Sequence, residues 1–138
     1  MKVSARDVVR VAAPLLAARA IAPFVARFVP LPAALSRARV ANSFFGAAVD
    51  VDVAAEVVQG IEALLRTFPR GSGTCLTRAL GRAYALRRAG IPVRFVLGVR
   101  SVDGKPEGHS WLTLDDKPFL EANVDNLRHF QVVWQDPR

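Results

Sequence analysis

The only cysteine of this sequence is the residue best suited to nucleophilic chemistry. Cys75 follows a polar segment at 71–74 (GSGT) and precedes a stretch with helical spacing of apolar residues. At a helix N-terminus, the helix dipole and the free backbone N–H groups favour the thiolate and can bind an oxyanion. Arg78, one turn further on, adds positive charge near the same face. We therefore predict that Cys75 is a nucleophile and not merely a small buried side chain.

His109 is the residue that the sequence offers as a base for this thiol. It follows a segment that contains Pro106 and Gly108, and we expect it to open a strand over residues 109–114. An imidazole there can accept the thiol proton and later protonate a leaving amine. Trp111 shares the same face of the strand and can pack beside the ring. This chemistry requires the sulfur and the imidazole to lie within proton-transfer distance of each other.

A carboxylate should orient the imidazole, and Glu121 in the next predicted strand is the first candidate. Its direction depends on the turn at residues 115–116. A two-residue turn directs Glu121 to the face of the sheet that points away from the His109 side chain. A three-residue loop or a bulge brings Glu121 beside His109. Asp125 and Asn123 are alternatives for the same role. The sequence leaves this choice open.

The pattern along the chain predicts helices first and a small antiparallel sheet afterwards. We expect Ser4 and Asp52 to be helix N-caps and Gly90 to be a helix stop signal. Pro14 is expected to kink the first helix. We expect helices at 4–21, 31–41, 53–67 and 75–89, a connection at 42–50, and strands at 93–100, 109–114 and 118–121, with 127–134 as a fourth strand or a docking tail. This order predicts an α+β domain in which the cysteine helix packs on an antiparallel meander. Residues 1–50 form the predicted helical N-terminal segment, and residues 51–138 form the predicted catalytic domain.

Length, charge and cysteine content limit the remaining possibilities. The chain has 138 residues and a net charge of +7, from 19 Lys and Arg against 12 Asp and Glu. The basic residues are scattered, which indicates a solvated surface or a groove for an acidic peptide and does not support nucleic-acid binding. A lone cysteine forms no internal disulfide, so no oxidising compartment is needed. No cofactor or metal site is expected.

The N-terminal segment does not resemble a secretory signal or a membrane span. The longest uncharged stretch between residues 8 and 31 runs from Val11 to Ala18, which is too short to cross a bilayer. An amphipathic segment lying on a membrane remains an alternative. We expect a cytoplasmic protein whose N-terminal helices pack on their own domain or on a partner.

Several motifs in a fixed order resemble one known family. These are residues 75–80 (CLTRAL), 87–93 (RRAGIPV), Gly98-Val99 and 109–111 (HSW). Together they resemble the transglutaminase-like domain of lasso-peptide biosynthesis B2 proteins, the leader peptidases of the papain and transglutaminase superfamily, over residues 54–134. The resemblance implies a triad of Cys75, His109 and the acid 12 positions after the histidine, which is Glu121. That family usually has Asp at this position, and Ala where this chain has Ser110.

The resemblance also implies a task and partners. Such enzymes cut the leader from a ribosomally made precursor peptide, usually with a separate leader-recognition protein and beside an ATP-dependent macrolactam synthetase. The N-terminal segment would then be a docking surface, and we expect Gly73, Arg78 and Trp111 to contact the substrate. Two alternatives remain open. The first is an enzyme that transfers the acyl group to an amine by the same thioester chemistry. The second is a catalytically silent module that binds a peptide or a membrane surface.

Overall fold

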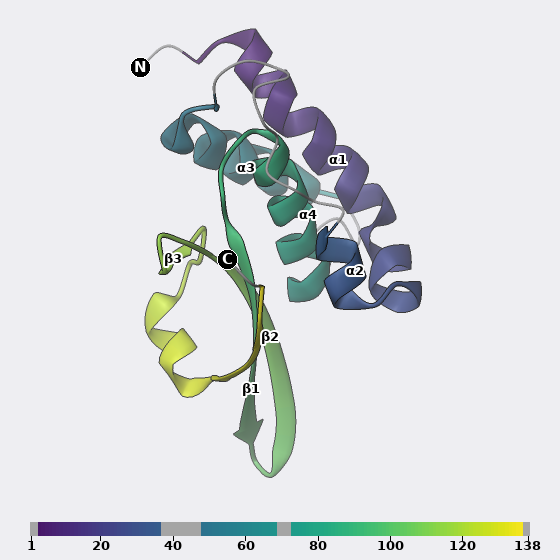
Figure 1. Ribbon diagram of the computed structural model, residues 1–138, viewed down its shortest axis with the longest axis vertical. Helices are drawn as coiled ribbons and strands as arrows, with labels where there is room; N and C mark the ends of the chain where they lie inside the picture. The colour runs from purple at the N-terminus through teal and green to yellow at the C-terminus, as the bar shows by residue number, and fades with distance from the viewer. Residues whose placement is uncertain (1–2, 37–47, 69–72, 137–138) are drawn as a thin grey trace.

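The computed structural model describes residues 3–36, 48–68 and 73–136 as helices packed against a four-stranded antiparallel sheet (Figure 1). The helices cover one face of the sheet, and a short 3₁₀ helix lies on the other side (Figure 1). The elements in chain order are α1 (Ala5–Phe28), α2 (Leu31–Ser36), α3 (Val51–Leu65), α4 (Cys75–Arg88), β1 (Arg94–Val102), β2 (Lys105–Leu114), β3 (Lys117–Phe119), η1 (Val124–His129) and β4 (Gln131–Gln135). The predicted α+β class is confirmed.

The first helix begins as the sequence predicts and continues further. The Ser4 hydroxyl accepts a hydrogen bond from the Asp7 backbone N–H at 3.1 Å, which makes Ser4 the N-cap. The helix was expected to end at residue 21, but α1 runs through Pro14 and Pro23 to Phe28. Each proline removes one backbone hydrogen bond, and the face of α1 that is buried against the other helices offsets this loss.

The third helix begins two residues earlier than predicted. The Asp50 carboxylate accepts hydrogen bonds from the backbone N–H groups of Asp52 at 2.9 Å and Val53 at 3.2 Å. Asp50 is therefore the N-cap of α3, and the predicted cap at Asp52 is wrong. Asp52 instead lies in the first turn, where its negative charge favours the helix N-terminus.

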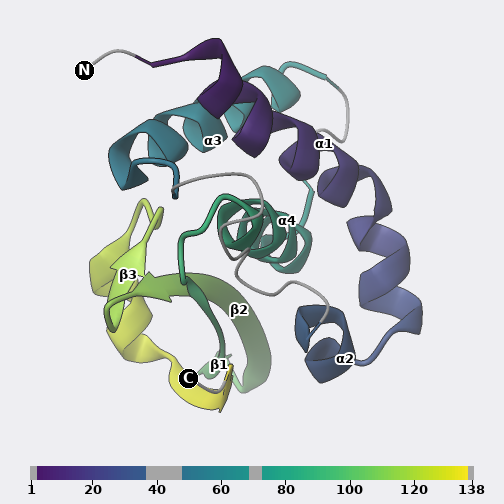
Figure 2. The same ribbon diagram turned by 45° about the horizontal axis from the view of Figure 1, so that its top comes forward.

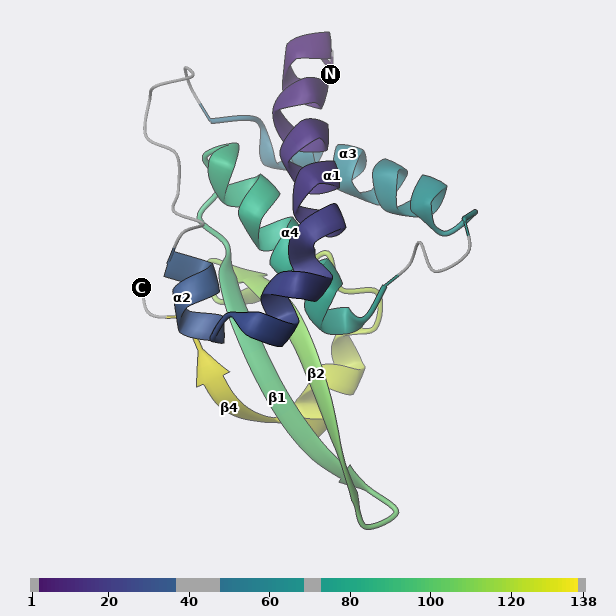
Figure 3. The ribbon, with the colours of Figure 1, turned by 90° about the vertical axis from the view of Figure 1, so that its right-hand side faces the viewer.

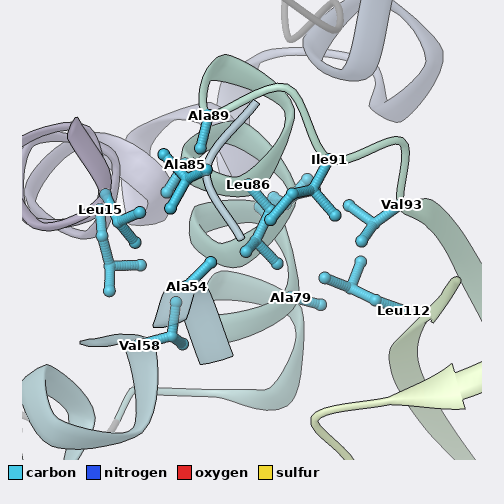
Figure 4. Close-up of a cluster of buried hydrophobic side chains, with 14 of the residues drawn as sticks. Leu15, Ala54, Val58, Ala79, Ala85, Leu86, Ala89, Ile91, Val93 and Leu112 are labelled. Atoms are coloured by element: carbon cyan, nitrogen blue, oxygen red, sulfur yellow. The ribbon is translucent and has the colours of Figure 1, made fainter. Parts of the chain in front are cut away.

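The cysteine helix α4 lies at the centre of the molecule (Figure 2). Figure 2 shows α1 and α3 on one side of α4 and the sheet on the other. Gly90 ends the helix with a φ of 88°, as the stop signal predicted. One hydrophobic cluster joins these layers, and its most deeply buried side chains include Val11, Leu15, Ala54, Val58, Ala83, Ala85, Leu86, Ile91, Phe95 and Leu112. Figure 4 labels part of this cluster, with Leu15 of α1, Val58 of α3, Leu86 of α4 and Leu112 of β2 among the side chains drawn. The N-terminal helix thus contributes to the same core as the segment after residue 50.

A long hairpin of β1 and β2 dominates the sheet and projects beyond the helices (Figure 3). Asp103 and Gly104 form its turn with φ of 51° and 76°, which is the left-handed pair that tight hairpins use. Both strands are longer than predicted, so His109 lies inside β2 and does not open it. Pro106 is part of the strand because none of the described strands pairs with β2 on its outer side there, and an edge position tolerates a residue without an N–H group.

The C-terminal strand does not continue the meander. It was expected as a fourth strand or a docking tail, and β4 does form a strand. However, β4 pairs with β1 on the far side of the hairpin, which gives the order β3-β2-β1-β4. The first part of the predicted segment is η1, which carries the chain from the end of β3 to the other edge of the sheet. Of the predicted helix at 31–41, residues 31–36 are helical, and the rest, with most of the expected connection at 42–50, lies outside the described residues.

A buried arginine connects several segments of the fold. Arg87 of α4 donates hydrogen bonds to the Val93 carbonyl at 3.0 Å and the Leu35 carbonyl at 3.3 Å, and it forms an ion pair with Asp136. Burial lowers the pKa of its guanidinium. Arg87 therefore links α4, α2, the start of β1 and the segment after β4 through one side chain.

The length and composition of α1 would allow it to cross a membrane, and it is the single such helix in the described part of the chain. The same helix packs on α3 and α4 through Val11, Leu15, Ala18 and Ala22. A core helix and an N-terminal signal meet the same criterion, so this property does not decide where the protein resides.

Candidate active site

Cys75 is the first residue of α4, and a capping box fixes it there. The Thr74 hydroxyl accepts a hydrogen bond from the Thr77 backbone N–H at 3.2 Å, and the Thr77 hydroxyl accepts one from the Thr74 N–H at 3.0 Å. These two bonds leave the N–H groups of Cys75 and Leu76 without an acceptor inside the helix. The thiol is half-buried and not disulfide-bonded, beside two backbone donors that can stabilise an anion.

Gly73 shapes the approach to this helix. Its φ is 64°, and a Cβ at this position would lie 2.7 Å from the Thr77 hydroxyl and 3.2 Å from the Arg19 guanidinium. The capping box and the guanidinium of α1 therefore occupy the space that a side chain would need. Gly73 was predicted to contact substrate, and its visible role in the structure is to let the chain turn into the cap.

The ring of His109 is held between two aromatic side chains. Trp111 lies 5.8 Å away between ring centroids with an interplanar angle of 23°, and Phe130 lies 5.4 Å away at 35°. Trp111 is only 7% exposed and shields the ring from water, as its position two residues along the strand predicted. Phe130 was missed by the sequence analysis, because nothing in the spacing of residues links the end of η1 to the middle of β2.

Gly98 makes room for this aromatic cluster. It lies opposite His109 on β1, and a Cβ there would come within 2.9 Å of both the Trp111 ring and the Phe130 Cβ. Contacts this short do not occur in folded proteins without displacement of one partner. Gly98 therefore leaves the space that Trp111 and Phe130 occupy beside His109.

The Glu121 carboxylate lies beside the His109 ring, with 3.3 Å between Glu121 Oε2 and His109 Nε2. The turn before it has two residues, Asp115 and Asp116, at φ of 52° and 62°, a register expected to direct Glu121 to the other face. The strand ends at Phe119, however, and Leu120 adopts a φ of 59°. This reversal turns Glu121 back toward His109. A kink after the strand thus does what a three-residue loop was expected to do.

Arg82 of α4 holds this kink in place. Its guanidinium donates a hydrogen bond to the Leu120 carbonyl at 3.0 Å. The same group makes a two-pronged ion pair with Glu62 of α3, at 2.7 and 2.5 Å. A leucine in the left-handed region is strained, so it needs such an external contact. The position of Glu121 therefore depends on a link between α3, α4 and the end of β3.

Cys75 and His109 approach β2 from different sides. Cys75 lines a cavity together with Gly108 and Ser110, the two neighbours of His109 in the strand. Because side chains alternate along a strand, the His109 ring lies on the opposite face with Trp111 and Phe130. Within the described residues no hydrogen bond joins the Cys75 sulfur to the His109 ring. Their approach to proton-transfer distance stays a prediction.

The strand edge between these two residues is open. The three residues of β3 pair only with Leu112, Thr113 and Leu114, so β2 has no outer neighbour at His109 among the described strands. Nε2 of the ring faces Glu121, which leaves Nδ1 for proton exchange with a thiol.

Comparison with known protein families decides the wider class. The family model described as the Transglutaminase-like superfamily matches residues 16–135, which include Cys75, His109 and Glu121. The chain belongs to this superfamily. No curated protein and no solved structure gives a significant match. The transglutaminase-like superfamily includes cysteine peptidases and acyltransferases and usually uses a catalytic cysteine.

The other predicted site residues of this transglutaminase-like domain lie further from the imidazole. Asp125 is exposed on η1, and Asn123 caps that helix by accepting a hydrogen bond from the Asn126 N–H at 3.3 Å. The structure gives neither residue a contact with His109, so its geometry favours Glu121. Among the described residues no group of three or more His, Cys, Asp or Glu side chains is arranged to hold a metal.

Arg78 belongs to a cluster of charges where α1 meets α4. Burial lowers the pKa of the Arg19 guanidinium, the charge of Glu62 opposes this shift, and the charges of Arg78 and Arg82 add to it. This places Arg78 near Arg19, whose guanidinium reaches the loop before Cys75. The predicted contact of Arg78 with substrate is not part of this arrangement.

Proposed function

We propose that this transglutaminase-like protein is a cysteine peptidase that removes the leader from a ribosomally synthesised precursor peptide during lasso-peptide maturation. The observation that carries the proposal is the His109–Glu121 pair at the open edge of β2, next to a helix that begins at the only cysteine. Membership of the superfamily supports the chemistry, and the ordered motifs around Cys75 and His109 support the substrate class.

The proposed reaction proceeds through a thioester. His109 takes the proton of Cys75, and the sulfur attacks the scissile carbonyl, whose oxygen the N–H groups of Cys75 and Leu76 stabilise. The C–N bond breaks as His109 gives the proton to the leaving amine. Water then attacks the thioester, His109 accepts a proton from it, and the C–S bond breaks to release the carboxylate and the thiol. Glu121 orients the ring and stabilises its charged form.

One movement is part of this mechanism. The His109 ring has to leave its place between Trp111 and Phe130 and turn around the uncovered edge of β2 to present a ring nitrogen to the sulfur, with the Glu121 carboxylate moving beside it. Such a rotation displaces no paired backbone at this strand edge, and it breaks the contacts of the His109 ring with Trp111 and Phe130. Catalytic hydrogen bonds that are long or missing without substrate commonly form only in the complex.

Partners and location follow from the same proposal. The exposed face of α1 carries Ile21, Phe24 and Phe28, whose side chains are 58%, 67% and 71% exposed. We place the docking surface for a separate leader-recognition protein on these residues, in the cytoplasm and beside a macrolactam synthetase. Phe28→Asp should weaken binding of the recognition protein in calorimetry without lowering the melting temperature, because the side chain is mostly in solvent. Equal affinity of Phe28→Asp and the parent protein would contradict this placement.

The test of the function is a cleavage assay on a lasso precursor peptide, with a leader-recognition protein present. We expect mass spectrometry to show leader and core as separate products, and Cys75→Ala to give none while its melting temperature stays near that of the parent. Complete processing by Cys75→Ala would overturn the mechanism. A product that has gained an added amine instead of water would identify the protein as an acyltransferase. A thiol that iodoacetamide modifies no faster than free cysteine would favour a silent binding module.

A further inference from the structure

A cavity of about 290 Å³ lies directly beside Cys75. It is enclosed by the start of α4, the C-terminal part of α1, the helix α2 and the middle of the β1–β2 hairpin. Figure 3 shows these elements converging, with α2 and the end of α1 next to α4 and the hairpin. The cavity is therefore adjacent to the atom that would form the bond to the substrate.

The walls of this cavity are almost entirely aliphatic. Side chains from three helices and one strand supply them, chiefly Val25, Val29, Leu31, Leu76, Leu80 and Leu97. The polar side chains among the described lining are the Cys75 thiol and the Ser110 hydroxyl, and Ser110 is 5% exposed. None of the described residues of this lining is charged. A charged group placed there would lose its hydration without gaining a partner.

The size of the cavity indicates what it can hold. Sites for complete small molecules run from roughly 300 to 1,000 Å³, so this cavity is at the lower limit of that range. It suits one side chain of a peptide and not a folded segment. A peptide whose scissile carbonyl lies at the sulfur would place an adjacent side chain within reach of this space.

We infer that this cavity is a specificity subsite that receives an aliphatic side chain next to the scissile carbonyl. The inference rests on the proposed function, since it assigns Cys75 as the nucleophile. It adds a substrate class, which is a peptide with an uncharged aliphatic residue beside the cleaved bond. Burial of each methylene group in such a site favours binding roughly fourfold.

The test uses small alkylating probes, because Cys75 is the only thiol in the chain and its modification is read unambiguously from the intact mass. Iodoacetamide, N-butyl-iodoacetamide and iodoacetate are each reacted with the purified full-length protein and with N-acetylcysteine. In every case the thiolate displaces iodide, so the three probes differ only in the group beside the reacting carbon. The measured quantity is the second-order rate with Cys75 divided by the rate with N-acetylcysteine.

We expect the N-butyl probe to gain more than about tenfold over iodoacetamide in this ratio, since at least two methylene groups would be buried, and we expect iodoacetate to fall below both. Equal ratios for the butyl probe and iodoacetamide would overturn the subsite while leaving the nucleophile intact. A thiol inert to all three probes would overturn the proposed function together with the subsite. The two failures are thus distinguished.

Matched variants locate the effect in the cavity. Ala26 and Ala34 line it from α1 and α2, so Ala26→Phe and Ala34→Phe should each remove the advantage of the butyl probe. Ala20 is exposed on the opposite side of α1, and Ala20→Phe should keep that advantage. Retention of the full advantage in both cavity variants would show that the butyl group binds elsewhere and would overturn the assignment.

Discussion

The carboxylate of Glu121 reaches the imidazole of His109 only because the chain reverses at Leu120, one residue before it. The two groups lie 3.3 Å apart, although the register of β2 and β3 would direct Glu121 to the other face. Arg82 stabilises this reversal from α4 by donating to the Leu120 carbonyl. The pairing of base and acid is thus a property of the helix–sheet interface and not of the sheet alone.

Removing the charge of Glu121 should slow catalysis without unfolding the protein. Glu121→Gln keeps the shape of the side chain but no longer stabilises a charged imidazole, so we expect turnover to fall about tenfold to a hundredfold. Glu121→Asp should retain more activity than Glu121→Gln. The measurement is the pH profile of precursor cleavage for each variant. Asp125→Asn is the matched control, and a larger loss in that variant would assign the orienting role to Asp125.

Adding one carbon at Gly98 should disturb the site more than its size suggests. Gly98→Ala places a Cβ within 2.9 Å of Trp111 and Phe130, so we expect a loss of about 1–3 kcal/mol in the free energy of unfolding and a change in tryptophan fluorescence. Gly60→Ala is the control, because Gly60 is exposed in α3 and nothing lies within 4 Å of an added Cβ. That variant should gain about 0.5–1 kcal/mol. Urea denaturation measures the free energy of unfolding of both variants. Equal effects of Gly98→Ala and Gly60→Ala would contradict the predicted contact of the added Cβ with Trp111 and Phe130.

The loop before Cys75 offers a comparison between two left-handed glycines. Gly73→Ala has both an unfavourable φ and a contact of 2.7 Å with the Thr77 hydroxyl, whereas Gly104→Ala, at φ of 76°, meets no atom within 4 Å. We expect Gly73→Ala to lower the free energy of unfolding by about 1 kcal/mol more than Gly104→Ala does, which is the typical contribution of an N-cap. We also expect Gly73→Ala to slow the alkylation of Cys75. Identical stabilities, measured by thermal denaturation, would mean that the capping box tolerates the added carbon.

The buried Arg87 should be among the most sensitive positions of the fold. Arg87→Met removes the partner of Asp136 and two bonds to backbone carbonyls, so we expect a loss of about 3–5 kcal/mol in urea denaturation. The neighbouring Arg88 is exposed and lies over the Tyr84 ring at 5.5 Å. Arg88→Met should cost no more than about 1 kcal/mol. Similar losses in the two variants would show that the contacts of Arg87 with Leu35, Val93 and Asp136 stabilise the fold no more than a surface contact does.

Local signals in the sequence were enough to predict the cysteine helix and its surroundings. Thr74 and Thr77 form a cap within four residues of chain, and Gly90 stops the helix because only a left-handed residue fits there. The two-residue turn at Asp115 and Asp116 is also a local property. Such features depend on neighbours in sequence, so the sequence predicted where the helix and the turn lie, although it left the length of that turn open and did not identify the Thr74–Thr77 cap.

The rest of the site depends on contacts between distant segments. Leu120 adopts a left-handed conformation that no propensity favours, and it does so because Arg82 binds its carbonyl from another element. Phe130 reaches His109 because β4 pairs with β1 and not with β3, a choice that strand patterns do not encode. The sequence pointed to Asp52 and not to Asp50 as the N-cap of α3, because both aspartates precede the helical pattern and either side chain could serve as the cap.

The shortness of β3 has a consequence for how molecules of this protein meet one another. Because β3 covers only three residues of β2, the hairpin exposes a row of backbone groups that could pair with the same row on another copy and start aggregation. The outer part of this row, away from β3, consists of Lys105, Pro106 and Glu107, all exposed. A proline and alternating charges are what natural sheets use to discourage such pairing. The backbone beside His109 can therefore stay uncovered in a crowded cell without becoming a template for polymers.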